Sequence, residues 1–60
     1  MSNEDWITNI VDASGEAASL HGSEAVRFVF AKYSAVCIED LQERYYPDVW
    51  GELFLMTHDD

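Results

Sequence analysis

The side chains in this sequence that could do chemistry are its acids, two histidines and one cysteine. His58, Asp59 and Asp60 are adjacent, and Glu52 lies one or two helical turns before them. Designed metal sites usually show paired His or Cys residues at ligand spacing, or an acidic calcium loop with its glycine. The sequence contains neither pattern. We therefore expect no metal site, and no motif calls for a cofactor.

Nucleophilic catalysis would require Cys37 or a serine beside a base and an orienting group. Spacing leaves a pairing of Cys37 with His21 or His58 open, because such groups meet in space. However, Cys37 lies in the apolar segment AVCI, which predicts a small, buried side chain with an ordinary thiol. A chain of 60 residues also leaves little room for a pocket of a few hundred cubic ångströms. We predict that the protein is not an enzyme.

The charge balance is strongly acidic. Twelve Asp and Glu residues oppose three basic residues, Arg27, Lys32 and Arg44, which gives a formal net charge of −9. Nucleic-acid binding depends on basic side chains that displace phosphate counterions, so direct nucleic-acid binding is disfavoured. Anionic membrane is disfavoured for the same reason. A basic protein partner, a divalent cation, or a purely solubilising role would each suit this charge.

Composition predicts one small folded domain over residues 1–60. Hydrophobic residues make up 48% of the chain, which is too many for a disordered segment. The single cysteine allows no intrachain disulfide. The start, MSNEDWITN, lacks the features of a signal peptide, and no apolar run approaches a membrane span. We expect a cytoplasmic protein of bacterial type.

The first helix is predicted over residues 4–21. Ser2 and Asp5 resemble a capping box, and Gly22 suits the position just past the helix end. Gly15 lies within the pattern and in phase, so one helix is favoured over a break at Ser14–Gly15. The amphipathic stripe has the spacing i, i+3, i+4, i+7 and contains Trp6, Ile7, Ile10, Val11, Ser14, Ala17, Ala18 and His21.

A second helix is predicted over residues 23–34, with Ser23 as N-cap. Val26, Val29, Phe30 and Tyr33 share one face. The segment SAVC then predicts an extended connection, and a short helical turn near 38–42 would insert Ile38 and Leu41 into the core.

The third helix is predicted over residues 46–57. Pro47 fits its first turn, because the first N–H groups of a helix have no internal partner. Its stripe comprises Tyr46, Val49, Trp50, Leu53, Phe54 and Met56. Residues 57–60 are expected to form a frayed acidic tail. The predicted fold is all-α, a small three-helix bundle.

Surplus apolar side chains predict a protein interface. Phe28 and Leu55 point away from their helices' stripes, and Tyr45 and Trp50 are large for a small core. These four residues form the candidate interface, for a protein partner or for a homodimer. The predicted function is a non-catalytic interaction module.

The alternative function is an acidic DNA mimic that inhibits a host nucleic-acid-binding defence or regulatory protein. A mimic needs carboxylates in rows on one face. Asp5, Asp12, Glu16 and Glu24 tend away from the stripes, but the acids are spread over all three predicted helices.

The segments AVRFVFAKY, IEDL and YYPDVWGEL resemble the carboxyl half of small, uncharacterised helical proteins of conjugative elements and prophages of Gram-positive gut bacteria. The resemblance spans Val26 to Leu53, and Pro47 departs from the pattern. It implies a small, helical, bacterial accessory protein and carries no activity with it.

Overall fold

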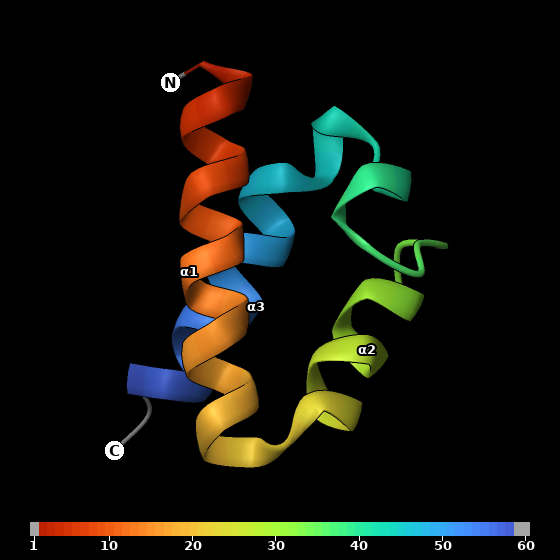
Figure 1. The fold of residues 1–60 in the computed structure, drawn as a ribbon. Helices are drawn as coiled ribbons and strands as arrows, with labels where there is room; N and C mark the ends of the chain where they lie inside the picture. Colours follow the sequence, from red (N-terminus) through yellow and green to blue (C-terminus); the bar gives the residue numbers. More distant parts are fainter. Residues whose placement is uncertain (1, 59–60) are drawn as a thin grey trace.

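Three α-helices joined by short connections make up the structure, a computed structural model that describes residues 2–58 (Figure 1). The helices are α1 (Asn3–His21), α2 (Ser23–Ala31) and α3 (Tyr46–His58). Two short 3-10 turns, η1 (Ile38–Asp40) and η2 (Glu43–Tyr45), lie between α2 and α3. The predicted all-α three-helix bundle is confirmed. Within the described range, no helix is long and apolar enough to cross a membrane.

α1 is a single helix with Ser2 as its N-cap, which is the Ser2 half of the predicted capping box. Ser2 Oγ accepts a hydrogen bond from the Asp5 backbone N–H at 3.3 Å, which satisfies one of the four unpaired N–H groups of the first turn. The helix runs through Gly15 without a break. At its end Gly22 has φ +91° and ψ 155°, a backbone conformation almost restricted to glycine.

α2 differs from its prediction at both ends. Its N-cap is Gly22 and no side chain caps it, so the prediction of Ser23 as N-cap is wrong: the turn at Gly22 already places Ser23 inside the helix. The helix ends at Ala31 and not at residue 34. Ser34 has φ 61°, its N–H bonds to the Ala31 carbonyl at 3.1 Å, and the Ala35 N–H bonds to the Phe30 carbonyl at 3.1 Å. This is a Schellman ending with serine in the usual glycine position.

The connection to α3 supplies part of the core. Cys37 is extended, with φ −150°, and η1 follows it. Leu41 is buried and Ile38 packs partly against the core, as the predicted helical turn requires. Pro47 is the second residue of α3, which confirms that this proline starts the helix and does not break one.

α1 packs more extensively against α3 than against α2. α1 and α3 run in the same direction (Figure 1), as contacts at both ends show. The Trp6 and Trp50 rings meet near the start of α1, with centroids 6.4 Å apart. At the other end His21 Nε2 donates to the Met56 carbonyl oxygen at 2.6 Å. The largest fully buried side chains come from α1 and α3: Ile10, Val49 and Leu53.

Only part of each predicted stripe reaches the core. Ile10 and Ala17 of α1 are buried, whereas Ile7 and Val11 are 36% and 52% exposed and His21 is exposed. The remaining buried hydrophobic residues are Val26, Val29, Phe30, Ala35, Leu41, Tyr46, Val49 and Leu53. Val11, together with Ser14 and Ala18 of the same stripe, forms one wall of a groove between α1, α2 and the connection.

Candidate functional site

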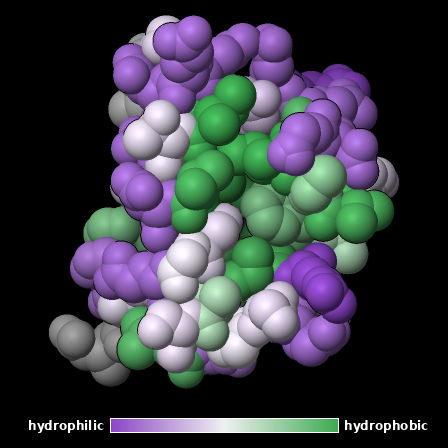
Figure 2. Space-filling view, in the orientation of Figure 1, coloured by the Kyte–Doolittle hydropathy of each residue, from purple (hydrophilic) through white to green (hydrophobic). Residues whose placement is uncertain are grey.

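An apolar groove of about 350 Å³ lies between α1, α2 and the connection that follows α2. Figure 2 shows apolar side chains gathered across this face, with hydrophilic residues around them. The groove contradicts the prediction that a chain of 60 residues leaves little room for a pocket of a few hundred cubic ångströms. The groove is lined by Val11, Ser14, Gly15, Ala18, Ser23, Val26, Arg27, Phe30, Val36, Cys37 and Ile38.

The groove exists because small residues occupy the α1 wall. Ser14, Gly15 and Ala18 follow Val11 at the i, i+3, i+4, i+7 spacing and therefore share its face. A Cβ atom added at Gly15 would meet nothing within 4 Å, so the glycine leaves open space rather than allowing a close contact. Val26 and Phe30 of α2 are buried beneath this space. Three small residues on one stripe were the signal in the sequence that points to a groove.

The polar atoms of the groove are few. Ser14 Oγ is buried and has no hydrogen-bond partner among the described residues. Arg27 binds Glu24 at 3.0 Å, an exposed ion pair one helical turn apart. Cys37 is exposed at the groove, so the prediction of a buried thiol is wrong. Val36, the residue before Cys37, is exposed too, at 82%, whereas Ala35 and Leu41 on either side of the pair enter the core.

The four residues of the predicted interface do not line this groove. Phe28 and Leu55 are 69% and 64% exposed, as expected of residues off their stripes. Tyr45 and Trp50 are half-buried and pack against the core. The Tyr45 ring lies 5.1 Å from the Tyr33 ring, and Lys32 Nζ lies 5.8 Å from the centre of the Phe28 ring. No recorded ring contact joins two of the four, and whether they form an interface stays a prediction.

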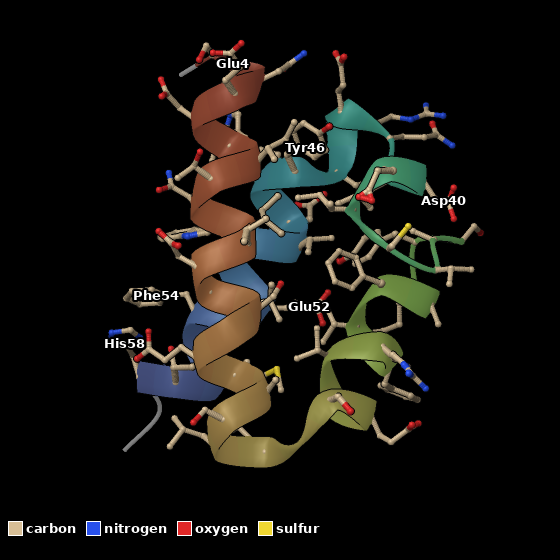
Figure 3. All side chains as sticks on the ribbon, in the orientation of Figure 1. Glu4, Asp40, Tyr46, Glu52, Phe54 and His58 are labelled. Carbon is tan, nitrogen blue, oxygen red and sulfur yellow. The ribbon has the colours of Figure 1, made fainter. Side chains whose placement is uncertain are left out.

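A row of rings follows α3 on the side away from the groove. Trp50 and Phe54 have centroids 5.0 Å apart, and Phe54 and His58 stack at 4.1 Å with an interplanar angle of 8° (Figure 3). Thr57 and His58 lie inside α3, and the Thr57 hydroxyl donates to the Phe54 carbonyl at 3.0 Å. The predicted frayed tail at 57–60 also includes Asp59 and Asp60, which lie outside the described residues.

Among the described candidates for metal binding and catalysis, both histidines have other partners. No group of three potential metal ligands occurs among the described residues. His21 bonds to the Met56 carbonyl, and His58 stacks on Phe54. Cys37 is exposed and lines the groove, and neither histidine is among the described residues that line it.

Glu52 joins α3 to the end of α2. One carboxylate oxygen accepts a hydrogen bond from Lys32 Nζ and the other accepts one from the Tyr33 hydroxyl. The bond to Glu52 raises the pKa of Tyr33 to about 12, and partial burial and the Glu52 charge act in the same direction. Burial pushes the pKa of Glu52 upward, but the hydrogen bonds from Lys32 and Tyr33 outweigh it and lower that pKa overall.

We expect Tyr33 to ionise well above pH 10.0. Its folded pKa is raised, so its contribution to stability is full below pH 10.0 and is lost as the pH rises towards about 12. Tyrosinate absorbance followed against pH measures this step. Glu52→Ala should move the ionisation of Tyr33 back towards pH 10.0. In the control variant Tyr45→Phe, the high-pH ionisation of Tyr33 should remain. A native protein with no tyrosinate step near pH 12 would contradict the assignment.

The contribution of Glu52 to stability depends on pH in the opposite direction to that of Tyr33. Its folded pKa is lowered, so its contribution is full above pH 4.5 and is lost as the pH falls below that value.

Comparison with known proteins adds no relative. No protein-family model, curated protein or solved structure matches this chain. The resemblance of Val26–Leu53 to proteins of mobile elements therefore stays a prediction, and the function must be argued from the groove and the charge.

Proposed function

We propose that this chain is a non-catalytic interaction module that binds a protein partner in the groove between α1 and α2. The observation that carries the proposal is the groove itself, together with apolar side chains left in water at its edges. Val36 is 82% exposed and Val11 is 52% exposed. Apolar surface that is hollowed, contiguous and rimmed by polar residues is the usual mark of a binding site.

The two open glycines provide a matched pair of variants. Gly15 lines the groove and Gly51 lies in α3 outside it, and neither has a neighbour within 4 Å of an added Cβ. Gly15→Leu should fill the groove without disturbing the helix, because leucine is a much better helix former than glycine. Gly51→Leu makes the same chemical change elsewhere on the surface.

The experiment is a pull-down from lysate of the native host with the native chain and both variants as bait. A partner captured by the native chain and by Gly51→Leu, but lost with Gly15→Leu, is the expected result. Phe28→Ser tests the other surface, since Phe28 lies outside the groove and is 69% exposed. Loss of the partner with Phe28→Ser and not with Gly15→Leu would move the interface to the residues predicted from sequence.

Self-association is the simplest form of this function. Sedimentation equilibrium of the native chain and Gly15→Leu separates it from binding to another protein. A dimer that Gly15→Leu dissociates would make the second copy the partner.

DNA mimicry is the second candidate, and one observation favours it. Because α1 is continuous through Gly15, Asp5, Asp12 and Glu16 fall within about 40° of one another around the helix at 3.6 residues per turn. All three are exposed. A captured partner that binds DNA, competes with DNA for the chain and is released by salt supports mimicry. Asp12→Asn with Glu16→Gln should then weaken capture, while Gly15→Leu should leave it unchanged.

A further inference from the structure

The dimensions of the groove limit what can occupy it. A cavity of about 150 Å³ holds one benzene-sized group, so about 350 Å³ accommodates roughly two large apolar side chains. Along α1 the lining runs from Val11 to Ala18, which is about 10 Å at 1.5 Å per residue. Two apolar side chains at positions i and i+4 of a bound helix, which would anchor it in the groove, lie about 6 Å apart along the helix axis. This separation fits within the length of the groove.

The walls of the groove favour a helical occupant. An extended peptide gains affinity by pairing its backbone with an open sheet edge. The walls here are α1 and α2, whose backbone groups are used within the helices, and the described residues contain no strand. An amphipathic helix instead needs only apolar side chains to dock, which the groove provides.

The charges around the groove indicate which charge the surface of a partner should carry. Each basic side chain is already engaged: Arg27 with Glu24, Lys32 with Glu52, and Arg44 with Gln42 and the Tyr45 ring. Two pairs of exposed carboxylates adjoin groove residues in the sequence and have no ion-pair partner among the described residues. They are Asp12 and Glu16 on α1, each about 100° around the helix from a lining residue, Val11 or Gly15, and Glu39 and Asp40 on η1, where Asp40 stands out from the turn (Figure 3). The charged residue that lines the groove itself is Arg27, and Glu24 neutralises it.

We infer that the occupant of the groove is a cationic amphipathic helix of a partner protein, with two apolar anchors one turn apart and Lys or Arg on its flanks. This inference rests on the proposed function and adds the chemistry of the partner. The anchors enter beside Gly15, and the basic flanks meet the carboxylates of α1 on one side and η1 on the other. A helix with acidic flanks would bring like charges together on both sides.

The test uses three synthetic peptides of equal length. The first is an amphipathic helix with leucines at i and i+4 and lysines on its flanks. The second replaces every lysine with glutamate, and the third scrambles the first so that no apolar face forms. Affinity is measured by calorimetry at low and high salt. Cys37, the single cysteine, reports occupancy, because a ligand in the groove should slow its alkylation.

The cationic amphipathic peptide should bind at least about tenfold more tightly than the acidic peptide, with the difference narrowing as salt is raised. It should slow alkylation of Cys37, and Gly15→Leu should abolish binding while Gly51→Leu leaves it intact. Equal binding of the acidic or scrambled peptide, or unchanged alkylation of Cys37, would overturn the inference. A peptide that merely dissociates a dimer of the chain would overturn it too, in favour of the second copy.

Different results would contradict the two proposals, namely that the groove binds a protein and that its occupant is a cationic helix. If no peptide binds but Gly15→Leu still removes a partner from lysate, the groove is a protein site and the cationic helix is wrong. If Gly15→Leu removes no partner and the native chain is monomeric, the groove is not the protein site at all.

Discussion

Leu53→Ala is expected to leave most of the protein unfolded at room temperature. Leu53 is fully buried, among the largest side chains with no exposure, and it belongs to α3, which forms the main interface with α1. Replacing a buried leucine with alanine typically costs 2–5 kcal/mol, from lost transfer energy and the cavity left behind. A core in a chain of 60 residues rarely supplies more than about 3–5 kcal/mol of net stability. The stability lost in Leu53→Ala is therefore comparable to the whole free energy of unfolding of the native protein.

Far-UV circular dichroism with urea titration measures the effect. The matched control is Leu55→Ala, two residues along the same helix, because Leu55 is 64% exposed. This variant should unfold within about 0.5 kcal/mol of the native chain. Equal unfolding midpoints for the two variants would mean that α3 does not bury the face described here.

Gly22→Ala is the second large effect, and it acts through the backbone. Gly22 has φ +91° and ψ 155°, in a region that is essentially restricted to glycine, and an L-residue held there costs about 1–3 kcal/mol. Space is not the cause, because a Cβ at Gly22 would meet nothing within 4 Å. We expect the melting temperature to fall by about 4–8 °C for each kcal/mol lost.

Gly15→Ala is the control, and we expect it to change the stability in the opposite direction to Gly22→Ala. Gly15 has ordinary helical geometry and open space around it, so alanine there should stabilise the protein by about 0.5–1 kcal/mol. Thermal unfolding of the three proteins should therefore rank Gly15→Ala above native and native above Gly22→Ala. A Gly22→Ala variant as stable as the native chain would show that the turn between α1 and α2 adopts another conformation.

The sequence predicts the helices well because each carries a local signal. The Ser2 cap, the first-turn Pro47 and the helix-ending Gly22 act over a few residues, and each is found where predicted. The end of α2 was missed because serine replaces glycine in its Schellman ending, so no glycine marks position 34.

The groove could not be predicted from periodicity in the same way. Periodicity identifies the face of α1 that turns inward, but the fit between two faces depends on side-chain volumes and on the angle at which helices meet. Ser14, Gly15 and Ala18 are too small to fill the space against α2, so part of a predicted core stripe became a surface. Cys37 was misplaced because apolar neighbours in sequence do not guarantee burial: Val36 beside it is itself 82% exposed, and both residues line the open groove.

The parallel arrangement of α1 and α3 has a consequence for how the chain folds. The helix that packs most extensively against the first one synthesised is the last to be made, so α1 and α2 together expose the faces of Ile10 and Ala17 until α3 arrives. Contacts between distant segments slow folding relative to contacts between neighbours. We expect the helical hairpin of residues 3–31 to lack stable tertiary structure alone, and folding to complete only when α3 docks.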